Sequence, residues 1–244
     1  MQVGLADRRN CAYDGGMALE FPHIDPVAFS IGPVPFIDLV FPIRWYALAY
    51  LAGFLLGWRY ALYLAGLDPL RKPDRVIVDD FLTWVVAGVI VGGRLGYVLF
   101  YNFDYYAANP VDILKLWHGG MSFHGGALGV VAALVIYPMI KGFHPLRLAD
   151  IVCAAVPIGL FFGRIANFIN GELFGRAGDV PWAMVFPRGG DVPRHPSQLY
   201  EAGLEGFVLF FLLFFMMRSD RVRNRPGLVS GAFLAGYGCF RAFV

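Results

Sequence analysis

The sequence predicts an all-α polytopic membrane protein, and three observations support this fold class. Of the 244 residues, 58% are hydrophobic and only 16% are charged, whereas soluble domains carry about 25% charged residues. The mean hydropathy of the chain is +0.58. Six apolar stretches approach the roughly 20 residues with which an α-helix crosses a hydrocarbon core of about 30 Å. These stretches are 45–65, 80–101, 121–140, 149–169, 200–217 and 227–244.

Each apolar segment ends where polar residues begin. The first is followed by the basic connection GLDPLRKPDR, and the second by the aromatic loop YNFDYYAANPVD. The third ends at the basic turn KGFHPLR, and the fourth at a long polar section, 171–196. The fifth precedes the strongly basic RSDRVRNR, and the sixth reaches the last residue. We therefore expect six transmembrane helices, with one small section outside the membrane between the fourth and the fifth.

The distribution of lysine and arginine predicts the orientation of these helices. The connections after the first, third and fifth segments carry Arg71, Lys72, Arg75, Lys141, Arg147, Arg218, Arg221, Arg223 and Arg225. Those after the second and fourth carry fewer basic residues: Lys115, Arg176, Arg188 and Arg194. By the positive-inside rule the first set is cytoplasmic. This places the N-terminus and the 171–196 section on the external side of a multi-pass membrane protein.

Charge and cysteine content exclude several classes of protein. A net charge of +2, without a basic run interleaved with aromatics, argues against a nucleic-acid partner. The three cysteines, Cys11, Cys153 and Cys239, are far apart and form no CxxC pattern, so they indicate neither a disulfide framework nor a metal site.

The N-terminal residues differ in character from the rest of the chain. Residues 1–16 are polar and precede a second methionine, Met17, and they lack the features of a cleavable signal peptide. We expect residues 1–16 to be a disordered or non-native extension. Residues 17–244 then form a single transmembrane domain.

Three arginines lie within or at the ends of apolar segments. Insertion scales assign a cost of roughly 2.5–3.5 kcal/mol to an arginine near the middle of a membrane, so Arg94, Arg164 and Arg241 each require a partner. For Arg94, in GGRLGY, we expect snorkelling to the interface or a structural ion pair.

The stretch GRIANFINGELFGR surrounds Arg164 with further polar residues. Arg164, Asn167 and Gly171 are spaced i, i+3 and i+7, so they share one helix face that continues towards Asn170 and Glu172. Four polar side chains at one depth exceed what a single ion pair requires. The pattern therefore predicts a polar site at the outer end of the fourth helix.

The same helix carries a stripe of small residues. Ala155, Gly159 and Gly163 repeat every four residues, a spacing that allows a neighbouring helix to approach closely. Pro157 lies between them and can kink the helix.

Two other motifs border the same outer leaflet. In WHGGMSFHGGALG, two Gly-Gly pairs surround His124, which favours a loop that dips into the membrane and offers backbone N–H groups to an anion. A histidine at a helix end is more often structural, and only the glycines favour a functional role. RHPSQLYE fits the pattern of a helix start, with Pro196 in the first turn and Glu201 complementing the helix dipole. Counting residues from the ends of the predicted helices places Tyr46 and Arg241 at this leaflet as well.

This set of residues suits a lipid phosphate. Two arginines with asparagine and glycine donors can hold a phosphate group, and a neighbouring histidine or tyrosine could move a proton. The sequence lacks the Asp-rich signature of Mg-dependent phosphatidyl transferases, and HExxH and GxSxG are absent. We therefore expect chemistry at a phospholipid without a metal or another cofactor.

Several blocks of the chain resemble one family. GRIANFINGELFG resembles the signature of the prolipoprotein diacylglyceryl transferases, and GGMSFHGG and HPSQLYE are similar to two further blocks of that family, in the same order. The resemblance runs from about Phe21 to the C-terminus and includes IDPVAFSIGP, GGRLGYVLFYN and GYGCFR.

The resemblance implies an enzyme of the bacterial inner membrane with seven helices. Such an enzyme transfers the diacylglyceryl group of phosphatidylglycerol to the lipobox cysteine thiol of a prolipoprotein, forming a thioether and releasing glycerol phosphate. By resemblance, the essential or catalytic positions are His124, Tyr46, Arg164 and Arg241. The positions expected to bind phosphatidylglycerol are Arg164, Asn167, Glu172, Gly175 and Arg241. The residue that accepts the thiol proton stays open.

The end of the chain departs from the family pattern. After the arginine that matches Arg241, family members continue with an acidic residue, another arginine and a seventh helix, so we expect a C-terminally truncated chain.

Two other functions fit an arginine-containing membrane bundle. An anion transporter should show matched polar interruptions near the midplane of two halves, whereas the polar residues here gather near one face. A non-catalytic subunit that binds phospholipid is the second alternative.

Overall fold

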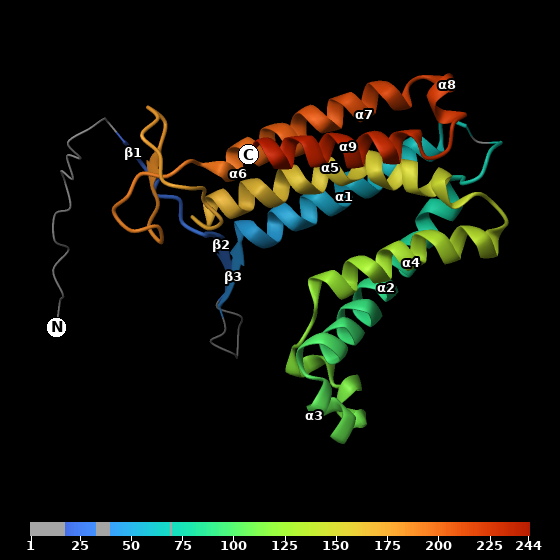
Figure 1. The fold of residues 1–244 in the computed structure, drawn as a ribbon, viewed down its shortest axis with the longest axis horizontal. Helices are drawn as coiled ribbons and strands as arrows, with labels where there is room; N and C mark the ends of the chain where they lie inside the picture. Colours follow the sequence, from blue (N-terminus) through green and yellow to red (C-terminus); the bar gives the residue numbers. More distant parts are fainter. Residues whose placement is uncertain (1–17, 33–39, 69) are drawn as a thin grey trace. The chain divides into compact units, whose positions relative to one another are not determined.

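A computed structural model describes residues 18–32, 40–68 and 70–244, so the expected extension, 1–16, lies outside the described residues. Within the described ranges, five helices are long and apolar enough to cross a membrane. They are α1 (Trp45–Ala65), α2 (Arg75–Tyr101), α4 (Phe123–Lys141), α5 (Pro145–Ile169) and the composite helix Ser197–Met217. A shorter apolar helix, α9 (Leu228–Phe243), follows (Figure 1). The prediction of a polytopic helical membrane protein is confirmed.

Some helices begin earlier than their apolar segments. The first segment has the bounds that were predicted, but α2 begins five residues before residue 80 because Asp74 caps it. The Asp74 carboxylate accepts a hydrogen bond of 2.9 Å from the N–H of Ile77, which satisfies one of the free donors of the first turn. Likewise, α5 starts at Pro145, where the missing N–H of proline costs nothing.

The fifth spanning helix has three parts with different hydrogen bonding. An α-helical start, α6 (Ser197–Glu201), leads into a π-helical stretch, η3 (Ala202–Val208), and then into α7 (Leu209–Met217). π-Helical turns within α-helices are uncommon and occur frequently at functional sites.

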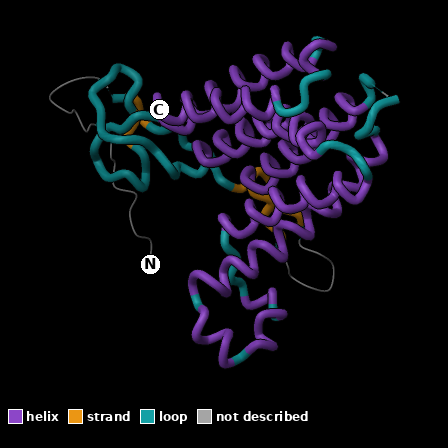
Figure 2. The backbone as a smooth tube through the Cα atoms, turned by 45° about the vertical axis from the view of Figure 1, so that its right-hand side comes forward, coloured by secondary structure: helices purple, strands orange, loops and turns teal. Residues whose placement is uncertain are grey.

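Short strands correct the expectation of an all-α fold. The strand β1 (Leu19–Glu20) pairs in parallel with β4 (Met184–Val185), which lies in the section between α5 and α6. The strand β2 (Val27–Ile31) pairs with β3 (Phe41–Arg44) in antiparallel fashion. Figure 2 shows these strands in orange beside the purple helices. All four strands lie in segments outside the spanning helices. Hydropathy identifies membrane helices but does not predict which short strands pair in such segments.

The chain divides into two compact units. The first comprises the described residues of 1–55 together with 157–209 and 237–244, and the second comprises the described residues of 56–156 together with 210–236. The second unit also contains the short helices α3 (Phe103–Ala108), η1 (Pro110–Leu114), η2 (Leu116–His118) and α8 (Asp220–Arg223).

Within the second unit, α2 and α4 run side by side and touch along glycines (Figure 1). A Cβ atom on Gly88 would lie only 2.7 Å from the carbonyl oxygen of Gly129. A Cβ atom on Gly96 would lie 2.7 Å from the Cα of Gly125. Both distances are below any ordinary contact, so these positions admit no side chain and the two backbones approach directly.

Within the first unit, the predicted small-residue stripe of α5 meets α1 at one position. A Cβ atom on Gly53 would lie 3.2 Å from the Cα of Gly159. An added Cβ would meet nothing within 4 Å at Gly159 or at Gly163, so among the described residues the close approach depends on Gly53 and not on these two members of the stripe.

Candidate functional site

The arginine of the fourth helix is paired with a glutamate of the fifth. The Nε atom of Arg164, on α5, lies 2.6 Å from Oε2 of Glu201, the last residue of α6. Both side chains are withdrawn from the surface, with 18% of Arg164 and 8% of Glu201 exposed. Because Glu201 Oε2 accepts no hydrogen bond from the described residues, the contact is an ion pair without aligned hydrogen-bond geometry.

The same glutamate also holds the second arginine of the predicted site. The Nη1 atom of Arg241, on α9, donates to Oε1 of Glu201. It also lies 3.5 Å from Oε1 of Glu205, a fully buried residue of the π-helical stretch. Glu201 therefore takes one guanidinium group on each of its oxygens. We call Arg164, Glu201, Glu205 and Arg241 the arginine–glutamate network.

The asparagines next to Arg164 hold a second glutamate. The side-chain amides of Asn167 and Asn170 donate to Oε1 of Glu172 over 3.1 and 3.2 Å. The buried side chain of Gln198, on α6, donates to the main-chain oxygen of Glu172 over 2.6 Å. Asn167 lies three residues after Arg164 on α5, and Gln198 lies three residues before Glu201 on α6. This second polar group and the arginine–glutamate network therefore both draw side chains from α5 and α6.

The turn that follows α5 requires unusual backbone angles. Gly171 has φ +62°, and Leu173, which is not a glycine, has φ +56°. A left-handed leucine is uncommon. The two angles turn the chain sharply on both sides of Glu172 and fix that residue beside the end of the helix.

Gly175 is packed too closely to carry a side chain. Its N–H donates to the carbonyl of His195 over 2.9 Å, and an added Cβ would overlap Oγ of Ser197. The contacts of Gly175 thus join the section after α5 to the start of α6. Its backbone donor is already used.

Tyr46 begins α1 in the same unit as both arginines. Its hydroxyl donates to that of Tyr50 over 3.1 Å, and the two ring centroids are 4.6 Å apart. The Tyr46 side chain is also accessible from outside the protein. Tyr46 thus has a hydrogen-bonded hydroxyl group and a partly exposed side chain.

His124 belongs to the second unit, whereas Tyr46, Arg164, Asn167, Glu172, Gly175 and Arg241 belong to the first. The expectation that His124 lies on a dipping loop is wrong, because His124 is in the first turn of α4. Ser122 caps that turn by accepting from the N–H of Gly125 over 3.2 Å. Of the two glycine pairs, only Gly119 and Gly120 have positive φ, and Gly125 is used to pack against α2.

The expectation that Arg94 snorkels to the interface or forms an ion pair is wrong, because Arg94 is buried and its hydrogen-bond partners among the described residues are main-chain oxygens. Its side chain is only 4% exposed and it lies 5.1 Å from the ring centroid of Tyr106. Its guanidinium group donates over 2.5–3.2 Å to the main-chain oxygens of Asp112, Ile113, Lys115, Gly119 and Gly120. Arg94 therefore anchors the connection between α2 and α4.

Comparison with known proteins identifies the family. The family described as "Prolipoprotein diacylglyceryl transferase" matches residues 26–244. The chain belongs to the prolipoprotein diacylglyceryl transferase family. It is 60% identical over 227 residues to the phosphatidylglycerol–prolipoprotein diacylglyceryl transferase of Azospirillum brasilense, covering 92% of this chain and 82% of that protein. It is 58% identical over 225 residues to the protein of the same name from Paramagnetospirillum magneticum, covering 92% of this chain and 81% of that protein.

Membership confirms the resemblance drawn from the sequence blocks, and with it the class of enzyme, a transferase. In this family member, the pairing of Arg164 and Arg241 through one carboxylate is the feature that sequence reasoning did not anticipate.

The pattern of RHPSQLYE indicates only a helix-start role for Glu201, as a complement to the helix dipole, and this interpretation is incomplete. The signal was present, because an arginine within a membrane segment requires a counter-charge and HPSQLYE is one of the blocks shared with the transferases. Glu205 lies four residues further along and gave no separate signal.

Outside the spanning helices of the transferase, one hydrogen-bonded group has shifted pKa values. Asp112 lies 2.6 Å from Lys115 Nζ and accepts from the hydroxyl of Tyr105 over 2.6 Å. Hydrogen bonding to Lys115, and then to Tyr105, lowers the pKa of Asp112 below its ordinary value. The hydrogen bond to Asp112 raises the pKa of Tyr105 above its ordinary value of 10.0.

Proposed function

We propose that this chain transfers the diacylglyceryl group of phosphatidylglycerol to the cysteine thiol of a prolipoprotein lipobox, and that the arginine–glutamate network holds the lipid phosphate. Family membership and the activity for which the close relatives are named support the reaction. The geometry of two arginines on one glutamate supports the assignment of the phosphate site.

The single observation that carries the assignment is the sharing of Glu201. A guanidinium group has five N–H donors in a rigid fork. Glu201 is approached by the Nε side of Arg164 and by Nη1 of Arg241. The terminal nitrogens of Arg164 form no hydrogen bond with the described residues, so they remain free to donate to phosphate oxygens. The carboxylate orients the two forks before any ligand binds.

The reaction requires charge stabilisation at the leaving group. The cysteine sulfur forms a bond to the terminal glyceryl carbon of the diacylglyceryl group, and the bond between that carbon and the phosphate oxygen breaks. Glycerol phosphate leaves with both electrons of the broken bond. Arg164 and Arg241 stabilise the negative charge that grows on this phosphate, because their charge does not depend on pH.

The thiol must lose its proton before or during attack. A free thiol has a pKa of about 8.5, so a nearby base or positive field is needed at neutral pH. Tyr46 and His124 are the two candidates that the family resemblance provides for this step. Asn167 and Glu172 form the polar wall beside Arg164, and Gly175 keeps the following section packed.

The proposed setting is the bacterial cytoplasmic membrane, with residues 17–244 as one catalytic transmembrane domain. In this arrangement α9 is the sixth spanning helix, and the N-terminus and residues 171–196 lie outside. The asymmetry of lysine and arginine between alternate connections supports this orientation. Labelling of single cysteines at Asp179 and Arg221 with an impermeant reagent tests it, since only the former should react in intact cells.

A direct assay tests the proposed reaction. The purified full chain is incubated in mixed micelles with acyl-labelled phosphatidylglycerol and a lipobox peptide, and mass spectrometry should detect a peptide that carries one diacylglyceryl group. A peptide with serine in place of cysteine is the control. Arg164→Lys keeps the charge but loses the fork, so turnover should fall. Lipid binding without any modified peptide would instead favour a non-catalytic phospholipid-binding subunit or an anion transporter.

A further inference from the structure

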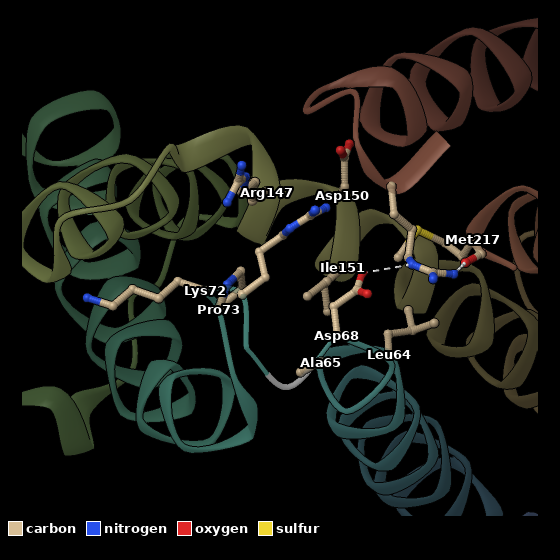
Figure 3. Close-up of a pocket in the computed structure, with 11 residues that line it drawn as sticks. Leu64, Ala65, Asp68, Lys72, Pro73, Arg147, Asp150, Ile151 and Met217 are labelled. Atoms are coloured by element: carbon tan, nitrogen blue, oxygen red, sulfur yellow. Dashed lines mark hydrogen bonds and ion pairs between the residues drawn. The ribbon is translucent and has the colours of Figure 1, made fainter. Parts of the chain in front are cut away.

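A small basic cavity lies in the second unit, where the ends of α1, α5 and α7 meet α8. Its volume is about 50 Å³, and its apolar floor includes Leu64, Ile151 and Met217. Its charged lining consists of Asp68, Arg71, Lys72, Arg147, Asp150 and Arg223. Among the residues labelled in Figure 3, Asp68 follows the end of α1, whereas Arg147 and Asp150 both lie on α5. The cavity shares no residue with the arginine–glutamate network.

The two carboxylates of the cavity are already engaged. Asp68 lies 3.0 Å from Nε of Arg223, and this ion pair is drawn as a dashed line in Figure 3. The oxygens of Asp150 accept from the N–H of Gly227 over 2.8 Å and from the N–H of Ser230 over 2.7 Å, which holds the start of α9. Arg223 is also paired with Asp220 and donates to the main-chain oxygen of Met217.

The remaining three cations have no carboxylate partner among the described residues. Arg71 donates to the neutral amide oxygen of Asn224, and Lys72 donates to the main-chain oxygen of Lys141 over 2.8 Å. The Nε atom of Arg147 is buried and forms no hydrogen bond with any described residue. A buried donor without a partner costs about 1–3 kcal/mol, so this atom is expected to have a ligand.

The charge and size of the cavity limit what that ligand is. Four cations and two carboxylates in the lining leave a net charge of +2, which favours an anion. A water molecule needs about 10–15 Å³ of such space, so the cavity has room for a few waters or for one tetrahedral oxyanion. Guanidinium groups match the geometry of phosphate oxygens. The dimensions exclude a whole lipid or a nucleotide but admit a single phosphate group.

We propose that this cavity binds the phosphate group of an anionic ligand, either a lipid headgroup of the adjacent leaflet or free phosphate. All four cations lie on the connections that the positive-inside rule assigns to the cytoplasm, and basic pockets between membrane helices on that side bind anionic headgroups. The proposed ligand would bridge the loop before α2 and the start of α5, which now carry unpaired like charges.

The positive-inside rule alone does not explain this cavity. That rule requires only basic residues at the cytoplasmic surface, and the exposed Arg221 and Arg225 satisfy it without lining this cavity. It does not require a buried, unpartnered guanidinium atom such as Nε of Arg147. Arg221 and Arg225 therefore serve as matched controls, since their removal takes two charges from the same set of connections.

The experiment compares two double variants of the full-length chain in zwitterionic phosphatidylcholine micelles. One variant is Arg71→Gln with Arg147→Gln, and the other is Arg221→Gln with Arg225→Gln. Thermal unfolding is followed while phosphatidic acid is added in one arm. Its phosphate carries no glycerol, so it cannot release the glycerol phosphate that leaves in the transfer reaction. Inorganic phosphate is added in the second arm, and additional phosphatidylcholine in the third.

The unmodified chain and the Arg221, Arg225 variant should unfold at higher temperature with phosphatidic acid, with half-saturation at similar concentrations. The Arg71, Arg147 variant should need at least a tenfold higher concentration. A shift with inorganic phosphate that depends on Arg71 and Arg147 would support the site and assign it to a soluble anion. Equal weakening in both double variants, or no shift of the unmodified chain in either anion arm, would overturn the proposal. If the Arg71, Arg147 variant does not fold, Arg147→Lys alone, which retains the charge but removes Nε, repeats the comparison.

Discussion

Glu201 is the residue whose substitution tests the site most sharply, because two arginines depend on it. In Glu201→Gln the side chain keeps its size but loses the charge that Arg164 and Arg241 share. Removing one partner of a buried ion pair costs about 3–5 kcal/mol. Arg241 is 48% exposed and water offsets much of its loss, so most of the cost falls on Arg164, and the lower value, about 3 kcal/mol, applies.

The same loss should appear in the reaction rate. If Arg164 is no longer held, the misplacement of a positioning residue costs on the order of a hundredfold in rate, which corresponds to about 2.7 kcal/mol in the activation barrier. We expect kcat/KM for lipid transfer to fall about a hundredfold in Glu201→Gln. Glu205→Gln should have a smaller effect, because Glu205 lies 3.5 Å from Arg241 and forms no ion pair with a second arginine among the described residues.

The assay measures transfer of labelled diacylglyceryl to a lipobox peptide for the unmodified chain, Glu201→Gln, Glu201→Asp and Glu205→Gln. Unfolding midpoints recorded in the same micelles separate loss of fold from loss of activity. Glu201→Asp retains the charge and should recover part of the rate. Transfer by folded Glu201→Gln within twofold of the unmodified chain would refute the role of the arginine–glutamate network.

Three further outcomes are expected. His124→Gln should lower turnover by about 10²-fold or more while phosphatidylglycerol still binds, as measured by single-turnover kinetics, if His124 takes the thiol proton; loss of binding alone would make it a headgroup ligand. Gly129→Ala should lower the free energy of unfolding by about 1–3 kcal/mol, because the new methyl group overlaps the backbone of α2, whereas Gly231→Ala meets no atom within 4 Å and should not destabilise. Asp112→Asn should lower the pKa of Tyr105 towards 10.0, as followed by ¹³C NMR of labelled tyrosine. Folding lowers the pKa of Asp112, so ionised Asp112 stabilises the fold above the ordinary pKa of aspartate, and this stabilisation is lost as the pH falls. An unchanged Tyr105 titration would contradict this coupling.

Sequence reasoning identified the helices better than their ends. Hydropathy located α1 at its observed bounds, since Trp45 and Ala65 coincide with the change from apolar to polar residues. It missed the first turn of α2, where Asp79 and Asp80 interrupt the apolar pattern although Asp74 caps the helix. A hydropathy window averages over many residues, whereas a capping residue sets the helix start through a single hydrogen bond. The average therefore does not show where α2 begins.

Sequence reasoning named Arg164 and Arg241 but not the carboxylate that joins them. The spacing of Arg164 and Asn167 correctly indicated one polar helix face, and Asn167 does contact Glu172. The partner of Arg164 could not be chosen from spacing, because Glu201 is 37 residues away on another helix. Only tertiary structure shows that one carboxylate serves both arginines.

The anchoring of the connection between α2 and α4 has a consequence for how that connection can vary. The hydrogen bonds from Arg94 to this connection all go to main-chain oxygens, so they do not depend on the exposed side chains that the connection carries. Large apolar side chains there, including Leu114 and Trp117, are exposed and can be exchanged without loss of those hydrogen bonds. Evolution can thus alter the surface that this segment presents to the membrane interface while its backbone path stays fixed. Arg94 itself has no such freedom, because a lysine could not reach five carbonyl groups at once.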